Sequence, residues 1–170
     1  MDVKTPDELY RDALSVSLRY ITHRDRTERE VINRLEKDGH PQSVTDRVLS
    51  FLREQGYVND KRYTEYYIVC YKDKRSTKRI RQELKNKGIE DELLDEVMKT
   101  TDLDTSEAAR NALKKQLLKR GIYDMEKISY EDKNKIMAAL FRQGYSAEEI
   151  RNEMDKMLTD SNQTHSGLSE

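Results

Sequence analysis

The residue types that usually carry catalysis or bind metals are few in this 170-residue sequence, and they stand far apart. His23, His40 and His165 lie in unrelated surroundings, and Cys70 is the single cysteine, so neither a zinc-ligand spacing nor an internal disulfide is available. The six glycines are dispersed, which excludes a glycine-rich loop of the kind that holds nucleotide phosphates. The sequence therefore predicts a protein that is not an enzyme and that uses no metal and no cofactor.

Basic side chains are the residues most able to act on a partner, because they are separated along the chain from the acidic ones. The net charge is only −1, but ten basic and three acidic residues lie between Lys61 and Lys87. Eight acidic residues against one lysine follow between Glu90 and Glu107, and Arg110–Arg120 then holds five basic residues and no acid. If the two positive segments face the same side, they predict a strongly positive surface.

This charge pattern predicts contact with an anionic partner. Four of the basic residues, between Lys74 and Arg79, gather at the expected start of a helix, where backbone N–H groups also favour phosphate. DNA phosphates and an acidic groove on a protein would both fit, and the alternative is a solvated surface balanced by the neighbouring acidic helix. Sequence-specific reading of DNA is less favoured, since no recognition helix is evident. The candidate binding residues are Lys72, Lys74, Arg75, Lys78, Arg79, Arg81, Lys85, Arg110, Lys114, Lys115 and Lys119.

The elements that position these side chains are predicted to be helices throughout. Two prolines and six glycines are too few for the turns of a sheet. N-capping residues, apolar residues at helical spacing and helix-ending glycines recur along the chain. They indicate an all-α fold of three rounds, each of three helices joined by short turns.

The middle helix of each round indicates that the rounds are repeats. When these helices are aligned on the glycines that end them, they agree at three further positions. The glycines are Gly39, Gly88 and Gly144; four residues earlier stand Leu35, Leu84 and Leu140, eight earlier Val31, Ile80 and Ile136, and twelve earlier the potential N-caps Thr27, Ser76 and Asp132, with Ser129 as the alternative start of the third middle helix. One three-helix repeat buries little surface alone, so tandem repeats should share their cores in an elongated molecule.

The stretch GYVNDKRYTEYY, which joins the first repeat to the second, holds four of the ten tyrosines. Asp60 is expected to cap the helix that follows. Tyr57 and Val58 are expected to pack across the turn, and Tyr63 and Tyr67, four residues apart, to line one buried helix face. Tyr66 points elsewhere on the helix, where it could contact a partner. Helical spacing favours this structural role over the stacking of bases on the tyrosines.

The repeats are predicted at residues 1–56, 57–101 and 102–158, followed by a polar tail at 159–170 that is expected to be disordered. The third repeat departs from the others through GIYDMEKI, which lengthens the connection before its middle helix. No apolar run approaches the ~18 residues of a membrane span, and the N-terminus lacks an apolar signal core. A soluble, cytoplasmic monomer is therefore expected.

Four stretches of the sequence resemble the RecX family of bacterial RecA regulators. They are ALSVSLRYITHRDRTEREVINRLEKDG, GYVNDKRYTEYYI, KRIRQELKNKGI and KIMAALFRQGYSAEEI, and together they cover roughly residues 9–158. The resemblance implies tandem three-helix repeats in an elongated and curved molecule that binds in the groove of the RecA filament on DNA. It also implies restraint of the recombinase, ATPase and coprotease activities of RecA, with no catalytic site and no cofactor. It assigns no individual binding residue.

On this resemblance, the expected function is regulation of RecA in DNA repair and the SOS response. The expected partner is the RecA filament on single-stranded DNA, contacted through the candidate basic residues, with direct contact to DNA as a further expectation. The alternative function is a helical repeat protein that binds DNA independently of RecA. A third interpretation is a helical scaffold for another partner.

Overall fold

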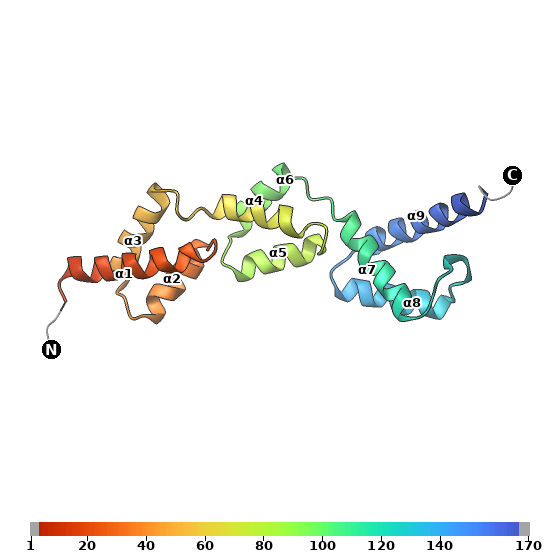
Figure 1. Ribbon diagram of the computed structural model, residues 1–170, viewed down its shortest axis with the longest axis horizontal. Helices are drawn as coiled ribbons and strands as arrows, with labels where there is room; N and C mark the ends of the chain where they lie inside the picture. Colours follow the sequence, from red (N-terminus) through yellow and green to blue (C-terminus); the bar gives the residue numbers. More distant parts are fainter. Residues whose placement is uncertain (1–3, 167–170) are drawn as a thin grey trace. The chain divides into compact units, whose positions relative to one another are not determined.

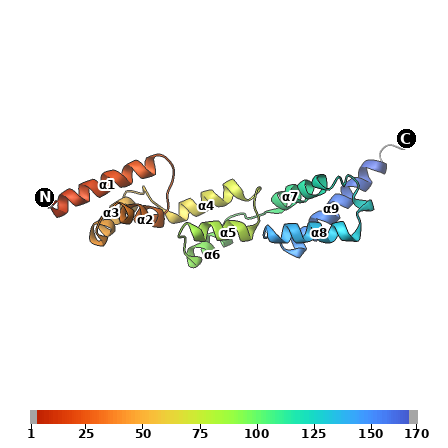
Figure 2. The ribbon, with the colours of Figure 1, turned by 90° about the horizontal axis from the view of Figure 1, so that it is seen from below.

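The protein is described here by a computed structural model that covers residues 4–166, with the side chains of residues 4–160 (Figure 1 and Figure 2). This part of the chain forms nine α-helices and one short 3-10 helix and contains no β-strand. They are α1 (Pro6–Thr22), α2 (Glu28–Lys37), α3 (Gln42–Glu54), α4 (Asp60–Tyr71), α5 (Thr77–Asn86), α6 (Asp91–Thr100), α7 (Ser106–Lys119), η1 (Met125–Lys127), α8 (Tyr130–Arg142) and α9 (Ala147–Ser166). The all-α helical repeat fold predicted from the sequence is confirmed.

The chain packs as two compact units. The first combines the chain up to Tyr67 with Glu83–Thr101, and the second combines Ile68–Gln82 with the chain from Asp102 onward. Helices α4 and α5 therefore contribute to both units. A sequence repeat and a packing unit are thus different divisions of this chain, and the repeat boundaries at residues 56 and 101 stay a prediction.

Each unit has its own apolar core. In the first unit α1 packs on both α2 and α3, and in the second α7 packs on both α8 and α9. The apolar stripe that the repeat alignment places on each middle helix is at most 1% exposed at every one of its positions: Val31 and Leu35, Ile80 and Leu84, Ile136 and Leu140. Burial of a side chain of this size stabilises a fold by roughly 1.5–3 kcal/mol, so these stripes are central to both cores.

The middle helices begin at predicted N-caps in all three repeats, and in the third the structure selects Ser129 over Asp132. Thr27 forms a capping box with Glu30, and the Arg79 N–H donates to Ser76 Oγ at 3.3 Å. In the third repeat the N-cap is Ser129, whose side chain accepts from the backbone N–H of Asp132 at 3.0 Å, so Asp132 is not the cap. Helix α8 is consequently 13 residues long, against 10 in α2 and in α5.

In the stretch GYVNDKRYTEYY the structure corrects one prediction. Asp60 does not cap α4, because Asn59 Oδ1 accepts the N–H of Arg62 at 2.9 Å. Across the turn at Gly56, the Tyr57 ring packs on that of Phe51, with 6.5 Å between the centroids, and Val58 is buried, although Tyr57 stays 53% exposed.

The other tyrosines of this stretch lie as the sequence predicts. Tyr67 is buried, and its ring stacks on that of Tyr63 with 6.1 Å between the centroids. Tyr66 is exposed.

The end of the chain is more ordered than the sequence predicts. Helix α9 continues to Ser166, so the disorder expected from Thr159 is wrong for residues 159–166. Arg110 on α7 forms an ion pair with Asp160 at 2.5 Å, and the Thr159 hydroxyl donates to the Asp155 carbonyl at 2.9 Å. These contacts carry the helix past the last apolar position. Residues 167–170 lie outside the described part of the chain.

Candidate functional site

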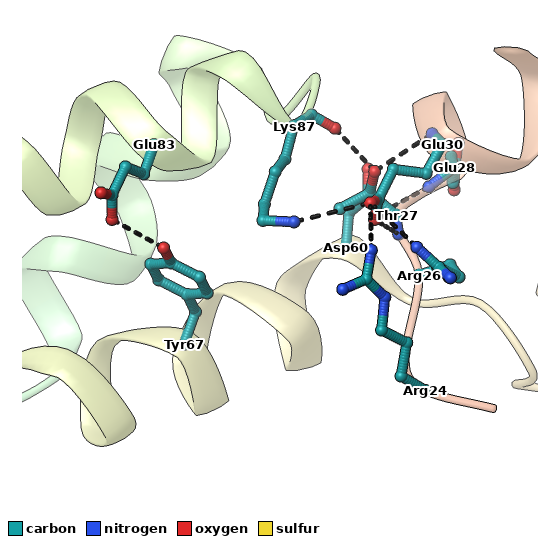
Figure 3. A network of polar contacts seen from close by, with 9 residues as sticks. All are labelled: Arg24, Arg26, Thr27, Glu28, Glu30, Asp60, Tyr67, Glu83 and Lys87. Carbon is teal, nitrogen blue, oxygen red and sulfur yellow. Dashed lines mark hydrogen bonds and ion pairs between the residues drawn. The ribbon is translucent and has the colours of Figure 1, made fainter.

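A hydrogen bond ties the start of one middle helix to the end of the next. In the first unit the Thr27 hydroxyl, at the N-cap of α2, donates to the carbonyl of Lys87 at 2.6 Å (Figure 3). Lys87 directly precedes Gly88, which has φ +86° and lies so close to Arg29 that a Cβ there would overlap the Arg29 side chain. The Lys87 ammonium also pairs with Glu30, at 3.5 Å. We call this contact the first joint.

The second unit repeats the arrangement with the next two middle helices. The Ser76 hydroxyl, at the start of α5, donates to the carbonyl of Gln143 at 2.8 Å. A Cβ on the following Gly144 would lie 2.7 Å from Ser76 Oγ and 3.3 Å from Lys78 Cβ. Gly39, which ends α2, has nothing within 4 Å of such a Cβ. We call this second contact the second joint. In both joints the glycine ends one helix, and its lack of a Cβ leaves room for the first turn of another helix.

The first joint contains a partly buried carboxylate. Asp60 Oδ1 accepts the backbone N–H of Glu28, at the start of α2, at 2.9 Å, while nearby Tyr67 donates to Glu83 at 2.7 Å (Figure 3). Burial raises the pKa of Asp60 to about 6, although the bond from Glu28 N–H favours the charged form. This carboxylate therefore joins α4 to α2 and is sensitive to mildly acidic pH.

Asp60→Asn is expected to remove a pH dependence from the stability of the first unit. Between pH 3.8 and about 6 the folded protein holds a proton that the unfolded chain releases, so the free energy of unfolding falls as pH rises through this range. Above it, the buried charge should cost about 1–2 kcal/mol once solvent screening is allowed for. In urea unfolding, the free energy of unfolding of the variant should equal that of the wild type near pH 4 and exceed it near neutral pH.

The control for this experiment is Asp25→Asn, which makes the same charge change at an exposed position of the first unit. It should leave the wild-type pH profile unchanged. An advantage of Asp60→Asn that is equal at both pH values would contradict a proton-linked effect.

The second joint leaves an open groove of about 460 Å³, which we call the basic groove. It is lined by Thr77, Lys78, Arg81, Phe141, Gly144, Tyr145, Ser146 and Glu149. Phe141 is 64% exposed, although it is a large apolar side chain, whereas Tyr145 is only 3% exposed. Burial raises the pKa of Tyr145, which keeps its phenol neutral. The groove therefore combines an apolar surface with two cationic side chains.

The carboxylate in the basic groove is already engaged. Glu149 accepts the backbone N–H of Ser146 at 2.6 Å, closing the predicted capping box of α9, and also accepts the Thr105 hydroxyl at 3.2 Å. Its charge lies at a helix N-terminus, where the helix dipole compensates it. Lys78 and Arg81 line the same groove.

The candidate basic residues are distributed over both units. Lys85 belongs to the first unit and the others to the second. The structure pairs Lys72 with Asp102, Lys85 with Asp91 and Arg110 with Asp160, at 2.7, 2.7 and 2.5 Å. Because their partners are exposed, such pairs contribute little stability and an anionic ligand can replace them.

The remaining candidates form two groups in the second unit. Around the start of α5, Lys78 and Arg81 line the basic groove, and Arg75 lies over the ring of Tyr71 at 4.4 Å. Lys74 and Arg79 are exposed nearby along the chain. On α7, Lys114, Lys115 and Lys119 share an exposed face with Leu118, which is 63% exposed.

The sequence analysis missed Phe141, although the repeat alignment carries a signal for it. Phe141 stands three residues before the stop glycine, where the other repeats have Glu36 and Lys85. A position that is charged in the other repeats is expected to face solvent, so an apolar residue there predicts an exposed apolar side chain. Such a side chain often marks a site of contact with a partner. The groove itself could not be foreseen, because it joins residues that are more than sixty positions apart.

The described part of the chain offers no group of three or more His, Cys, Asp or Glu side chains that could hold a metal ion. Over the same residues, every helix is too short or too polar to cross a lipid bilayer. The chemistry that the arrangement supports is non-covalent: cationic side chains and an exposed aromatic ring around a groove.

Comparison with known proteins finds two family models along the chain. Residues 13–52 match the model described as RecX, first three-helix domain, and residues 59–98 match RecX, second three-helix domain. A protein named Regulatory protein RecX from Clostridium tetani is 28% identical over 142 residues, which are 84% of this chain and 65% of that protein. Its namesake from Halorhodospira halophila is 28% identical over 147 residues, 85% of each chain.

The chain spans from about half to about nine-tenths of the length of such curated relatives; the match to the one from Geobacillus kaustophilus, 30% identical, covers 51% of that protein. The crystal structure of RecX from Lactobacillus salivarius is also similar, with a TM-score of 0.75 and 23% sequence identity. The similarity covers 90% of this chain and 98% of that one, and at this identity it supports the fold alone.

Proposed function

Because this chain belongs to the RecX family, we propose that it binds the RecA filament on single-stranded DNA and regulates RecA. In this proposal it acts as a monomer, without catalysis, and lowers the recombinase, ATPase and coprotease activities of RecA in DNA repair and the SOS response. The observation that carries the proposal is the basic groove, where Phe141 is exposed beside Lys78 and Arg81.

The composition of the basic groove favours a protein partner. Aromatic anchors near the centre of an interface contribute much of its binding energy, while surrounding charges steer association and fix orientation. A DNA backbone would attract Lys78 and Arg81 but would gain little from an exposed Phe141. An acidic protein surface with an apolar side chain would use all three.

The groups on α5 and α7 would extend this contact. In the proposal, Lys72, Lys74, Arg75 and Arg79 meet acidic side chains or DNA phosphates around the groove, and Arg110, Lys114, Lys115 and Lys119 form a second contact. Lys85 belongs to the first unit and would contact the partner separately. Exposed ion pairs such as that of Lys72 with Asp102 are weak, so they can exchange partners on binding.

ATP hydrolysis by RecA on single-stranded DNA tests the proposal. Addition of the purified chain in amounts equimolar to the filament is expected to lower the hydrolysis rate in a dose-dependent manner. The control is a helical protein of similar size and charge that lacks an exposed aromatic groove. An unchanged rate at equimolar amounts would contradict the proposal, and a raised rate would support the partner but contradict inhibition.

A second candidate function is DNA binding that does not need RecA. The observation in its favour is the exposed face of α7, where Lys114, Lys115 and Lys119 lie together. This function predicts affinity for naked DNA that falls steeply with salt, since each neutralised phosphate releases counterions. Binding to RecA filaments with no measurable binding to naked DNA would exclude it.

A further inference from the structure

A pocket in the first unit, outside the candidate basic residues, has the features of an anion site. It lies where the last turns of α1 meet α2, has a volume of about 280 Å³, and is lined by Val16, Arg19, Tyr20, His23 and Arg34. We propose that this pocket binds one phosphate of a single-stranded nucleic acid. The proposal goes beyond the function above, because it needs neither RecA nor the basic groove.

In each of the two arginines of the pocket, the Nε–H group donates a hydrogen bond to a neighbouring residue. Arg19 Nε donates to the carbonyl of Ser15 at 3.4 Å, and Arg34 Nε donates to the Asp38 carboxylate at 2.9 Å. Each bond fixes a guanidinium group and leaves its terminal amino groups for a ligand. Paired amino groups match the oxygens of a phosphate, so little side-chain freedom is lost on binding.

The aromatic wall of the pocket is held by a third arginine. The guanidinium carbon of Arg26 lies 3.9 Å from the centre of the Tyr20 ring, and that of Arg34 lies 5.9 Å from it. Arg26 also pairs with Glu30, at 3.5 Å. Tyr20 and Val16 thus form a fixed, largely apolar wall beside cationic groups, a surface suited to a sugar–phosphate unit.

The carboxylates near the pocket cancel only part of its charge. Glu30 is shared among Arg24, Arg26 and Lys87, while Asp38 is bound to Arg34 and offsets the charge of that guanidinium group. Arg19, in the last turn of α1, offsets the helix dipole there and is the cation that a phosphate in the pocket would meet first, with the terminal amino groups of Arg34 beside it.

The shape of the pocket favours a single strand over a duplex. A volume of about 280 Å³ is of the order of one small ligand group, and the pocket is an open depression in the surface. A single strand can turn one phosphate into such a hollow, whereas duplex phosphates follow a stiff cylinder. The site would therefore prefer single-stranded nucleic acid.

The test compares Arg19→Gln with Arg11→Gln in the full chain. Both residues are exposed on α1 and the charge change is the same, but Arg11 does not line the pocket. Binding of a fluorescent oligothymidine without RecA is measured by anisotropy at several salt concentrations, with circular dichroism as the check of folding. Arg19→Gln is expected to weaken binding by about tenfold and to reduce the salt slope by about 0.7, while Arg11→Gln changes affinity less than about twofold.

Two further measurements complete the test. Arg34→Lys keeps the charge but loses the paired amino groups, and it is expected to weaken binding by about fivefold. A duplex of the same length is expected to bind more weakly than the single strand and to respond equally to Arg19→Gln and Arg11→Gln. Equal effects of these two variants on the single strand, or no binding of the single strand by the folded wild type, would overturn the proposal.

Discussion

Gly88→Ala is expected to destabilise the first unit by about 2–5 kcal/mol. Gly88 has φ +86°, a conformation that costs a residue with a Cβ about 1–2 kcal/mol. The added Cβ would also overlap the side chain of Arg29, and relief of that overlap would displace α2 from the end of α5. The Thr27 to Lys87 hydrogen bond would lengthen or break as a result. Urea or thermal unfolding measures the loss.

Gly39→Ala is the matched control for this prediction. Gly39 also ends a middle helix in the first unit and has φ +81°, but a Cβ there meets nothing within 4 Å. Its substitution should cost only the conformational part, about 1–2 kcal/mol. Equal losses for Gly39→Ala and Gly88→Ala would show that the first joint contributes no close packing, and would contradict this account of it.

Phe141→Ala is expected to weaken binding to RecA filaments on single-stranded DNA by about tenfold or more, as loss of an aromatic anchor usually does. Because Phe141 is 64% exposed, the free energy of unfolding should change by no more than about 0.5 kcal/mol. Lys78→Glu is expected to weaken binding similarly and to make it less dependent on salt, since it reverses the charge at the groove. Affinity is measured by titration of labelled protein with preassembled filaments.

The chain offers a control for each of these two variants. Tyr130, on the same helix as Phe141, is 82% exposed and does not line the basic groove, so Tyr130→Ala should bind as the wild type does. Lys133→Glu makes the charge change of Lys78→Glu at another exposed position of α8. If each control loses as much affinity as its test variant, the effect comes from general charge or hydrophobicity, and the groove is not the contact.

The helices and their repeat could be predicted because the signals are local. A cap such as Thr27 and a stop glycine such as Gly88 act within one turn of helix, so both can be recognised from the neighbouring residues in the sequence. Gly88 and Gly144 have a second role, which is to let the start of another helix approach closely. That role depends on residues far away in the sequence. Asp60 failed as a predicted cap for the same reason: its partner, the N–H of Glu28, lies 32 residues away.

The positive charge of the candidate site could be predicted from the sequence, but its groove could not. The excess of basic residues around Lys78 is visible in the sequence, whereas the ion pair that engages Lys72 depends on Asp102, 30 positions away. The exposure of Phe141 is equally hidden, because apolar residues on a helix usually face the core. Tertiary contacts thus decide which basic residues line the groove.

Co-sedimentation with RecA filaments tests the central claim most directly. Filaments are assembled on long single-stranded DNA with a nucleotide that RecA does not hydrolyse, and the wild-type chain is spun with them and with the DNA alone. The account predicts that the chain pellets with the filaments in a saturable manner, and that excess Phe141→Ala protein competes far less well than excess Tyr130→Ala protein. A chain that stays in the supernatant with filaments, while it pellets with naked DNA, would contradict the account.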